Sequence, residues 1–230
     1  MLDTGFKDKK VVLFDLDGTL TDPGIGITNS VMHALNHYGI HVADRSELYK
    51  FIGPPLSQSF ERYYGFSIED AHHAVEVYRE YFAVKGLFEN IVYPGIEELL
   101  KELKAQGKVI SLATSKPEIY AKQILEHFKL DVYFDFISGS LLSGERVDKG
   151  EVITWAIDSL RQMGVDCAPE QIVMIGDREH DVLGAHKNQI PAIGVLFGYG
   201  SREEFQEAGA DAVAETVADL HGMLTGVELK

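Results

Sequence analysis

Two aspartates near the start of the chain, Asp15 and Asp17, lie two positions apart and are followed by Gly18 and Thr19. In an extended chain, side chains two residues apart point to the same side, so both carboxylates would face one site. One carboxylate can attack as a nucleophile, while the other protonates a leaving oxygen and later activates water. Two carboxylates this close repel each other unless a cation lies between them. The pair therefore predicts nucleophilic and acid–base chemistry at a cation site.

A third carboxylate, Asp177, follows the apolar residues 172–175, and Asp181 lies four positions further on. Three carboxylates at one site would make a hard divalent cation close to obligatory, and oxygen ligands without His or Cys favour Mg²⁺ over zinc. An alternative is that Asp177 and Asp181 only begin a helix, where the dipole favours acidic side chains. We expect the first of these, with Mg²⁺ as the cofactor.

Hydroxyl and amino groups follow another apolar segment, since Thr114, Ser115 and Lys116 come directly after residues 109–113. The carboxyl ends of parallel strands share one edge of a sheet, and ligands bind there. We therefore expect these groups to meet the aspartates at a single edge. Gly18 would let the backbone turn tightly, so that its N–H groups face a phosphate.

The rest of the chain alternates between short apolar runs and amphipathic stretches, which is typical of a parallel sheet with helices on both faces. The apolar runs, expected as strands, are Val11–Phe14, Val109–Ala113, Phe134–Ile137, Ile172–Ile175, Ala192–Phe197 and, more weakly, Ala212–Ala214. Apolar residues at helical spacing occur around 96–103, 121–128 and 153–160. The expected fold class is α/β, a three-layer Rossmann-like core.

One segment breaks this alternation. Residues 21 to about 92 contain helical patterns and no convincing strand, with turn signals at Pro23-Gly24 and Tyr93-Pro94-Gly95. We therefore predict a core domain formed by residues 1–20 and 92–230. An α-helical domain formed by residues 21–91 would be inserted after the first strand.

Composition narrows the class of partner. The 230 residues carry a formal net charge of −15, which repels nucleic acid polymers and anionic membranes. No apolar run approaches the roughly 20 residues of a membrane span, the first ten residues do not resemble a signal peptide, and the single cysteine, Cys167, allows no internal disulfide. We expect a cytoplasmic protein, monomer or homodimer, and the family resemblance given next implies that it acts on a small phosphorylated metabolite.

The motifs together resemble the haloacid dehalogenase superfamily of phosphatases. Residues 14–20, Phe-Asp-Leu-Asp-Gly-Thr-Leu, are similar to its first motif, and Leu112-Ala113-Thr114 is similar to its second. Lys149 resembles the third motif and residues 176–181 the fourth, in the same order and at similar spacing. The resemblance covers essentially the whole chain.

This resemblance implies a role for each position. Asp15 would be the nucleophile, forming a phospho-aspartyl intermediate, and Asp17 the general acid and base. The groups implied to be catalytic are Asp15, Asp17, Thr114 and Lys149; those implied to bind phosphate are Leu16, Asp17, Thr114, Ser115 and Lys149. Mg²⁺ would be held by Asp15, the Asp17 backbone carbonyl and Asp177, with Asp181 in contact through water.

Lys149 can also be placed from its neighbours alone. Asp148 and Glu151 have the spacing of a capping pair, which puts Lys149 in the first turn of a helix. A helix start favours anions, and a lysine there adds to that preference.

Further segments resemble the 5′-nucleotidase and phosphoglycolate phosphatase branch: residues 51–55, 85–86, 93–95, 114–117 and 198–200. In that branch the helical insertion is a cap that closes over the site. Gly53 and Pro54 would then influence substrate choice, together with Lys116 unless that lysine lies on the surface. A nucleoside 5′-monophosphate and 2-phosphoglycolate are both expected substrates, and the sequence does not choose between them.

Two other classes of function stay open. A β-phosphoglucomutase-like phosphomutase would use the same motifs and return the phosphate to a sugar. A non-catalytic binding module would keep the fold and use the insertion to hold a partner, although it gives no reason to retain Asp15, Asp17, Asp177 and Lys149.

Overall fold

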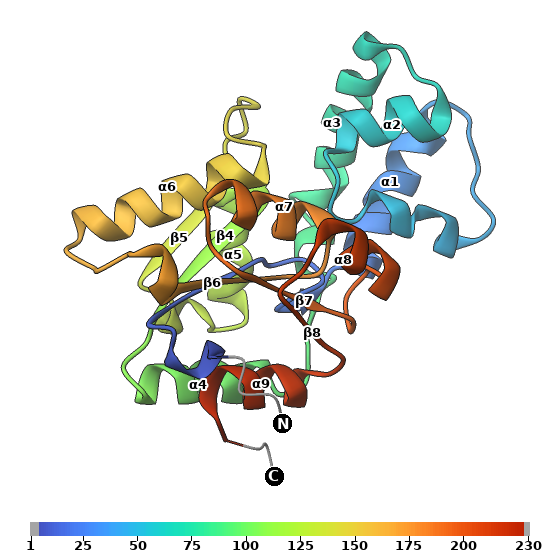
Figure 1. The fold of residues 1–230 in the computed structure, drawn as a ribbon. Coiled ribbons are helices and arrows are strands. Elements are labelled where there is room, and N and C mark those ends of the chain that lie inside the picture. The colour runs from blue at the N-terminus through green and yellow to red at the C-terminus, as the bar shows by residue number, and fades with distance from the viewer. Residues whose placement is uncertain (1–4, 228–230) are drawn as a thin grey trace. The chain divides into compact units, whose positions relative to one another are not determined.

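A computed structural model of the chain describes residues 5–227 (Figure 1). The chain divides into two compact units. The larger unit contains the residues up to Leu20 and those from Val92 onward, and the smaller unit contains Thr21–Ile91. A cap function for the smaller unit stays a prediction, because the division by itself does not show what that unit does.

The larger unit is built on a six-stranded sheet in the order β5-β4-β1-β6-β7-β8, in which every neighbouring pair is parallel. The strands are β1 (Val11–Phe14), β4 (Val109–Pro117), β5 (Phe136–Ser140), β6 (Ile172–Gly176), β7 (Ala192–Val195) and β8 (Ala212–Ala214). The first strand lies in the middle of the sheet, between β4 and β6. Its burial on both faces explains why all four of its residues are apolar.

Helices cover both faces of this sheet, which confirms the three-layer α/β class (Figure 1). They are α4 (Ile96–Ala105), α5 (Glu118–His127), α6 (Lys149–Gln162), α7 (Glu179–Lys187), α8 (Arg202–Ala208) and α9 (Val217–Thr225), with short 3₁₀ turns η1 (Phe6–Asp8), η4 (Asp131–Tyr133) and η5 (Pro169–Gln171). Apolar side chains of α6, α7 and α8 share one buried cluster with β1 and β6. On the other face α4 packs against α9.

Four of the expected strands have other boundaries. The sixth strand, β6, continues to Gly176, and β7 ends at Val195 rather than at Phe197. Tyr133 and the two residues before it form η4, so β5 begins at Phe136 rather than at Phe134 and continues to Ser140. The strand expected at 109–113 extends to Pro117, through polar residues that an apolar pattern does not mark as strand.

The smaller unit consists of helices packed on one another. They are α1 (Gly24–His37), α2 (Leu56–Tyr64) and α3 (Ile68–Phe82), with 3₁₀ turns η2 (Arg45–Phe51) and η3 (Gly86–Phe88). Both α1 and α2 pack against α3. The rings of Phe51 and Phe60 lie 5.1 Å apart, and those of Phe60 and Phe66 lie 5.6 Å apart, so aromatic side chains fill the interior of this small unit.

The expectation that residues 21–92 contain no strand is wrong at its two ends. There β2 (Thr21–Asp22) pairs with β3 (Ile91–Val92). Strands of two residues are too short to show the alternation by which strands are recognised in a sequence.

Among the described residues, no helix is long and apolar enough to cross a membrane.

Candidate active site

Most of the predicted site residues lie at the carboxyl edge of three adjacent strands. Phe14, the last residue of β1, pairs in register with Leu112 of β4 and Ile175 of β6. The next residue, Asp15, continues the ladder, and its N–H donates to the Ile175 carbonyl at 2.9 Å. Asp15, Thr114 and Asp177 therefore lie on three neighbouring segments at the carboxyl edge of the sheet.

Three carboxylates form a cluster at this edge. Asp15, Asp177 and Asp181 are all buried, and each offers an oxygen that lies within 4.8 Å of the other two. Burial raises the pKa of Asp177 well above its ordinary value, and the negative charges of Asp181 and Asp15 raise it further. A cation among these oxygens would favour the ionised carboxylate and so oppose both causes.

The oxygens of Asp177 differ in their partners. The Tyr199 backbone N–H donates to Asp177 Oδ2 at 2.8 Å. Asp177 Oδ1 is buried and has no hydrogen-bond partner among residues 5–227. A buried carboxylate oxygen without a partner is costly unless something else binds it. The donor set, all carboxylate oxygen, fits a hard divalent cation such as Mg²⁺.

Lys149 supplies the positive charge already present in the cluster. Its Nζ lies 2.8 Å from Asp15 Oδ1 and 2.6 Å from Asp181 Oδ1, and it donates to the Ala113 carbonyl at 2.9 Å. Burial pulls the pKa of Lys149 down, but the two carboxylates outweigh burial and hold it above its ordinary value. The lysine therefore stays charged.

The Asp148 half of the capping pair expected around Lys149 is present. Lys149 is the first residue of α6, and the Asp148 side chain accepts hydrogen bonds from the N–H groups of Gly150 at 2.9 Å and Glu151 at 3.3 Å. The cap fixes where the helix begins, and so fixes the direction in which Lys149 leaves the backbone.

The two carboxylate oxygens of Asp181 have different partners. It lies in the first turn of α7, and its Oδ2 accepts a hydrogen bond at 3.0 Å from the N–H of Arg178, the residue before the helix. The reading of Asp181 as a helix-start residue is therefore correct for Oδ2. Its Oδ1 faces Lys149, so the same side chain also belongs to the cluster.

Asp17 forms an ion pair with Lys116. The alternative that Lys116 lies on the surface is wrong, because its side chain is only 6% exposed. Burial raises the pKa of Asp17 and Asp15 adds to that rise, although Lys116 opposes it. A raised pKa favours a bound proton, which suits a group expected to act as a general acid.

Thr114, Ser115 and Lys116 lie in an irregular part of β4. Ala113 pairs with Ser138 and Pro117 with Ser140, so four steps along β4 match two steps along β5. Such a bulge redirects side chains, and bulges are frequent beside active sites. Thr114 is buried, and its Oγ1 accepts a hydrogen bond from the Lys116 N–H at 3.3 Å.

Leu16 lies between the two aspartates of the first motif and is fully buried. Its carbonyl accepts a hydrogen bond from the Leu20 N–H at 2.9 Å, so residues 16–20 form a compact turn. The use of its backbone for phosphate binding stays a prediction.

Glycines make room for the carboxylates. A Cβ at Gly18 would lie 2.0 Å from Asp177 Oδ2, and one at Gly176 would lie 2.0 Å from Asp181 Cγ. Gly18 also has a φ of 82°, a conformation that other residues rarely adopt. Gly198, in the loop after β7, would place a Cβ 2.4 Å from the Asp177 Cβ.

The loop after β7 is a part of the site that sequence reasoning missed. Gly198, Tyr199 and Gly200 served only as a family resemblance, yet the Tyr199 N–H holds Asp177. The close approach of two glycines was the available signal, but backbone N–H groups carry no mark in a sequence.

Gly53 and Pro54 belong to the smaller unit, where they lie between η2 and α2. Gly53 has a φ of 101°, which favours glycine at that position. Their part in substrate choice stays a prediction.

Comparison with known proteins identifies the family. The profile described as "Haloacid dehalogenase-like hydrolase" matches residues 12–195. A protein named 5′-nucleotidase from Pseudomonas aeruginosa is 49% identical over 195 residues, 85% of this chain and 86% of that protein. The Mycobacterium tuberculosis protein named Tyrosine-protein kinase PtkA is 37% identical over 217 residues, 94% of this chain and 72% of that protein.

A solved structure is also similar. The crystal structure of a predicted phosphatase from Clostridium acetobutylicum is 51% identical, with a TM-score of 0.90, and the match covers 95% of this chain and 99% of that one. The chain therefore belongs to the haloacid dehalogenase-like hydrolases and is an enzyme of their phosphatase type.

Proposed function

We propose that this enzyme is a Mg²⁺-dependent phosphomonoesterase that works through a phospho-aspartyl intermediate on Asp15. The observation that carries the proposal is the buried cluster of Asp15, Asp177 and Asp181, with Lys149 Nζ 2.8 Å from Asp15. A nucleophilic carboxylate beside a fixed positive charge is what attack on an anionic phosphate requires.

The reaction has two steps. Asp15 attacks phosphorus, the bond from phosphorus to the ester oxygen breaks, and Asp17 gives its proton to the departing alcohol. Asp17 then takes a proton from a water molecule, whose oxygen attacks phosphorus while the bond to Asp15 breaks and inorganic phosphate forms. The raised pKa of Asp17, caused by burial, suits it to hold the first proton.

Other residues of the chain bind the transferring phosphoryl group. Lys149 and the Thr114 hydroxyl would hold its oxygens, together with N–H groups of residues 16–17 and the Ser115 side chain. Asp15, the Asp17 carbonyl and Asp177 would hold Mg²⁺, with Asp181 in contact through water. When bound, the ion would offset negative charge on the phosphoryl group.

The proposed substrate is a nucleoside 5′-monophosphate. The similar protein named 5′-nucleotidase supports this choice, and 2-phosphoglycolate is the second candidate on the motifs noted in the sequence. The smaller unit would act as a cap that excludes water while the intermediate forms. A cytoplasmic location also stays part of the proposal.

A substrate panel tests the function. We expect kcat/KM to be highest for one nucleoside 5′-monophosphate among nucleotides, 2-phosphoglycolate and sugar phosphates. EDTA should abolish turnover and Mg²⁺ restore it, and Asp15→Asn should lower kcat by at least about 10³-fold. Turnover that survives in Asp15→Asn would contradict the phospho-aspartyl mechanism.

The identity of the acceptor is tested in the same experiment. The relative named as a tyrosine kinase, and the phosphomutases that share these motifs, raise a hydroxyl group as an alternative to water. We expect one inorganic phosphate for each ester consumed. Phosphate that appears on a sugar or on a tyrosine would favour group transfer over hydrolysis.

Substrate choice tests the cap assignment. Gly53→Trp should change the ranking of substrates more than it changes the rate of the best one, because the loop would meet the leaving group and not the phosphate. An unchanged ranking would contradict the assignment.

A further inference from the structure

The loop that joins β5 to α6, residues 141–148, lies between two segments of the proposed site. Before it, β5 is hydrogen-bonded to β4, the strand that carries Thr114. After it, α6 begins with Lys149. The proposed mechanism uses no side chain of this loop. Arg146, with a φ of 55°, is one of three described residues other than glycine with a positive φ.

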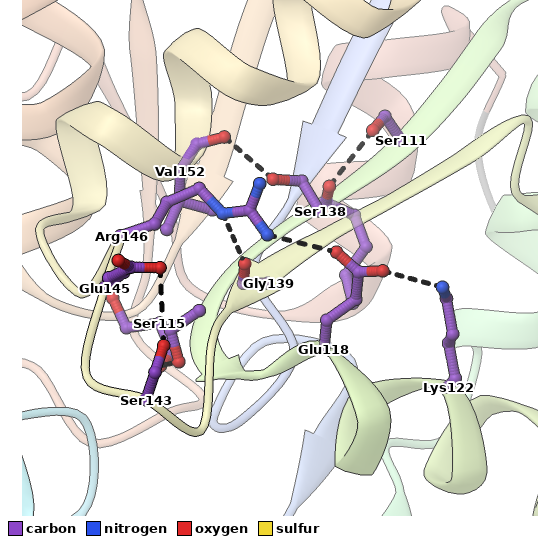
Figure 2. Close-up of polar contacts among 12 residues, drawn as sticks. Ser111, Ser115, Glu118, Lys122, Ser138, Gly139, Ser143, Glu145, Arg146 and Val152 are labelled. Atoms are coloured by element: carbon purple, nitrogen blue, oxygen red, sulfur yellow. Dashed lines mark hydrogen bonds and ion pairs between the residues drawn. The ribbon is translucent and has the colours of Figure 1, made fainter.

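Arg146 makes three contacts from this loop. Its Nε donates to the Gly139 carbonyl at 2.9 Å, and its guanidinium lies 3.4 Å from Glu118 Oε2 (Figure 2). The guanidinium also lies over the Trp155 ring of α6, 4.9 Å from its centroid. Because a planar guanidinium can pair at its edge and stack on its face together, one side chain joins β5, α5 and α6.

The contact with Glu118 connects Arg146 to the end of β4, the strand that carries Thr114. Glu118 is the first residue of α5 and directly follows Pro117, the last residue of β4. A Cβ at Gly139 would lie 2.6 Å from Glu118 Cα and 2.7 Å from the Lys116 carbonyl oxygen, so these backbones are in direct contact. Arg146 holds both partners of this contact, Gly139 through its carbonyl and Glu118 through its carboxylate.

A second hydrogen bond ties β5 to the same segment. The buried Ser140 hydroxyl donates to the Ser115 carbonyl at 2.8 Å. The irregular stretch of β4 is therefore in contact with residues 139–140 of β5. Arg146 attaches the loop that follows β5 to the same place.

The contact with Trp155 connects Arg146 to α6, the helix that begins with Lys149. Trp155 lies less than two turns along α6 from Lys149, and Arg146 is two residues before the capping Asp148. The stacked guanidinium thus holds the entry of the chain into α6. Lys149 reaches Asp15 and Asp181 from this entry at 2.8 and 2.6 Å, distances that a small shift of the helix start would change.

We propose that Arg146 is a positioning residue for phosphoryl transfer. It fixes the stretch 114–118 and the start of α6 relative to each other, so that Thr114 and Lys149 approach the same phosphoryl group. Arg146 acts through these segments and touches no reacting atom. The proposal rests on the proposed phosphatase function.

The test compares Arg146→Gln with Lys122→Ala. Lys122 pairs with the other oxygen of Glu118 at 2.6 Å but has no contact with the loop among those described, so it controls for loss of a cation at Glu118. With p-nitrophenyl phosphate and Mg²⁺, Arg146→Gln should lower kcat and kcat/KM together, by about 10- to 100-fold, as expected when catalytic groups are misplaced. Lys122→Ala should stay near the wild-type values.

Two further readouts separate positioning from general destabilisation. Arg146→Lys keeps the charge and should recover part of the lost kcat. Amide hydrogen exchange in Arg146→Gln should rise in peptides that cover 114–120 and 148–154 and stay unchanged in β6 and β7. Faster exchange across the whole chain, with kcat lowered only in proportion to unfolded protein, would overturn the proposal.

The design also separates this inference from the function on which it rests. If wild type turns over phosphate esters, Asp15→Asn does not, and Arg146→Gln matches wild type, the positioning role is wrong and the phosphatase stands. If wild type and Asp15→Asn are equally active or both inactive, the phosphatase proposal fails and the positioning role fails with it.

Discussion

Asp148 and Lys149 are neighbours in the chain, yet their ion pairs lie in opposite surroundings. Asp148 pairs with Lys187 at 2.9 Å, with side chains 48% and 62% exposed. Lys149 pairs with Asp15 and Asp181, and the three side chains are 6%, 10% and 2% exposed. The first residue of α6 thus points into the protein from a helix start whose capping side chain faces water.

The difference lies in what can replace a lost partner. Water solvates Asp148 if Lys187 is removed, so an exposed pair contributes little to stability. Asp15 and Asp181 have no such replacement, because burial leaves their charges without solvent. Similar distances between charged atoms therefore have different consequences, and replacing the lysine of each pair can measure them.

The largest effect should come from Lys149→Met. This variant keeps the length of the side chain and leaves two buried carboxylates without their cation, which should lower the free energy of unfolding by about 3 kcal/mol or more in metal-free protein. Urea unfolding in EDTA measures it, and Mg²⁺ should restore part of the loss. A change below about 1 kcal/mol in EDTA would show that the carboxylates are neutralised in another way.

A smaller effect should appear in the way the stability of metal-free protein depends on pH. Burial and neighbouring carboxylates raise the pKa of Asp177 in the folded chain, and the pKa values of Asp17 and Asp181 are raised as well. The folded state therefore binds these protons more tightly than the unfolded state does. The tighter proton binding contributes to the stability of the folded state at low pH, and this contribution is lost as the pH rises through the raised pKa values.

Thermal unfolding checks the sign. In EDTA, the melting temperature of wild type should fall as the pH rises above about 4, since the unfolded pKa values of these acids lie near 3.8 and the folded values are higher. Saturating Mg²⁺ should reduce the slope, because the cation replaces the protons. Asp177→Asn should show a shallower slope in EDTA, and a slope equal to that of wild type would assign the effect to other groups.

The smallest effect should come from Lys187→Ala. The exposed pair with Asp148 should change the free energy of unfolding by about 0.5 kcal/mol or less, and less still at high salt. Asp148 keeps its hydrogen bonds to the N–H groups of Gly150 and Glu151, so the helix cap survives. A loss comparable with that of Lys149→Met would remove the contrast between the two pairs.

The sequence was most informative where burial is complete. The central strand, Val11–Phe14, has the bounds expected, because a strand covered on both faces must be apolar throughout. The meeting of Asp15 with Asp177 was predictable for a related reason. Parallel strands bring their carboxyl ends to one edge, whatever the distance between them along the chain.

Other features have no local pattern to read. The burial of Lys116 depends on Asp17, which is 99 residues away. Judged by residue type alone, a lysine suits the surface equally well. The Tyr199 contact uses a backbone N–H, which every residue except proline has. The strands β2 and β3 are too short for periodicity, and the contacts of Arg146 join segments that lie apart in the sequence.

The glycines around the carboxylates have a use beyond this chain. A methyl group at position 18 or 176 would occupy space held here by Asp177 or Asp181. A chain of the same fold with alanine or a larger residue at either position would have to move that aspartate or lose it. Such a substitution in a genome sequence would therefore identify a homologue whose acidic pocket has been rebuilt, even where the aspartates themselves are retained.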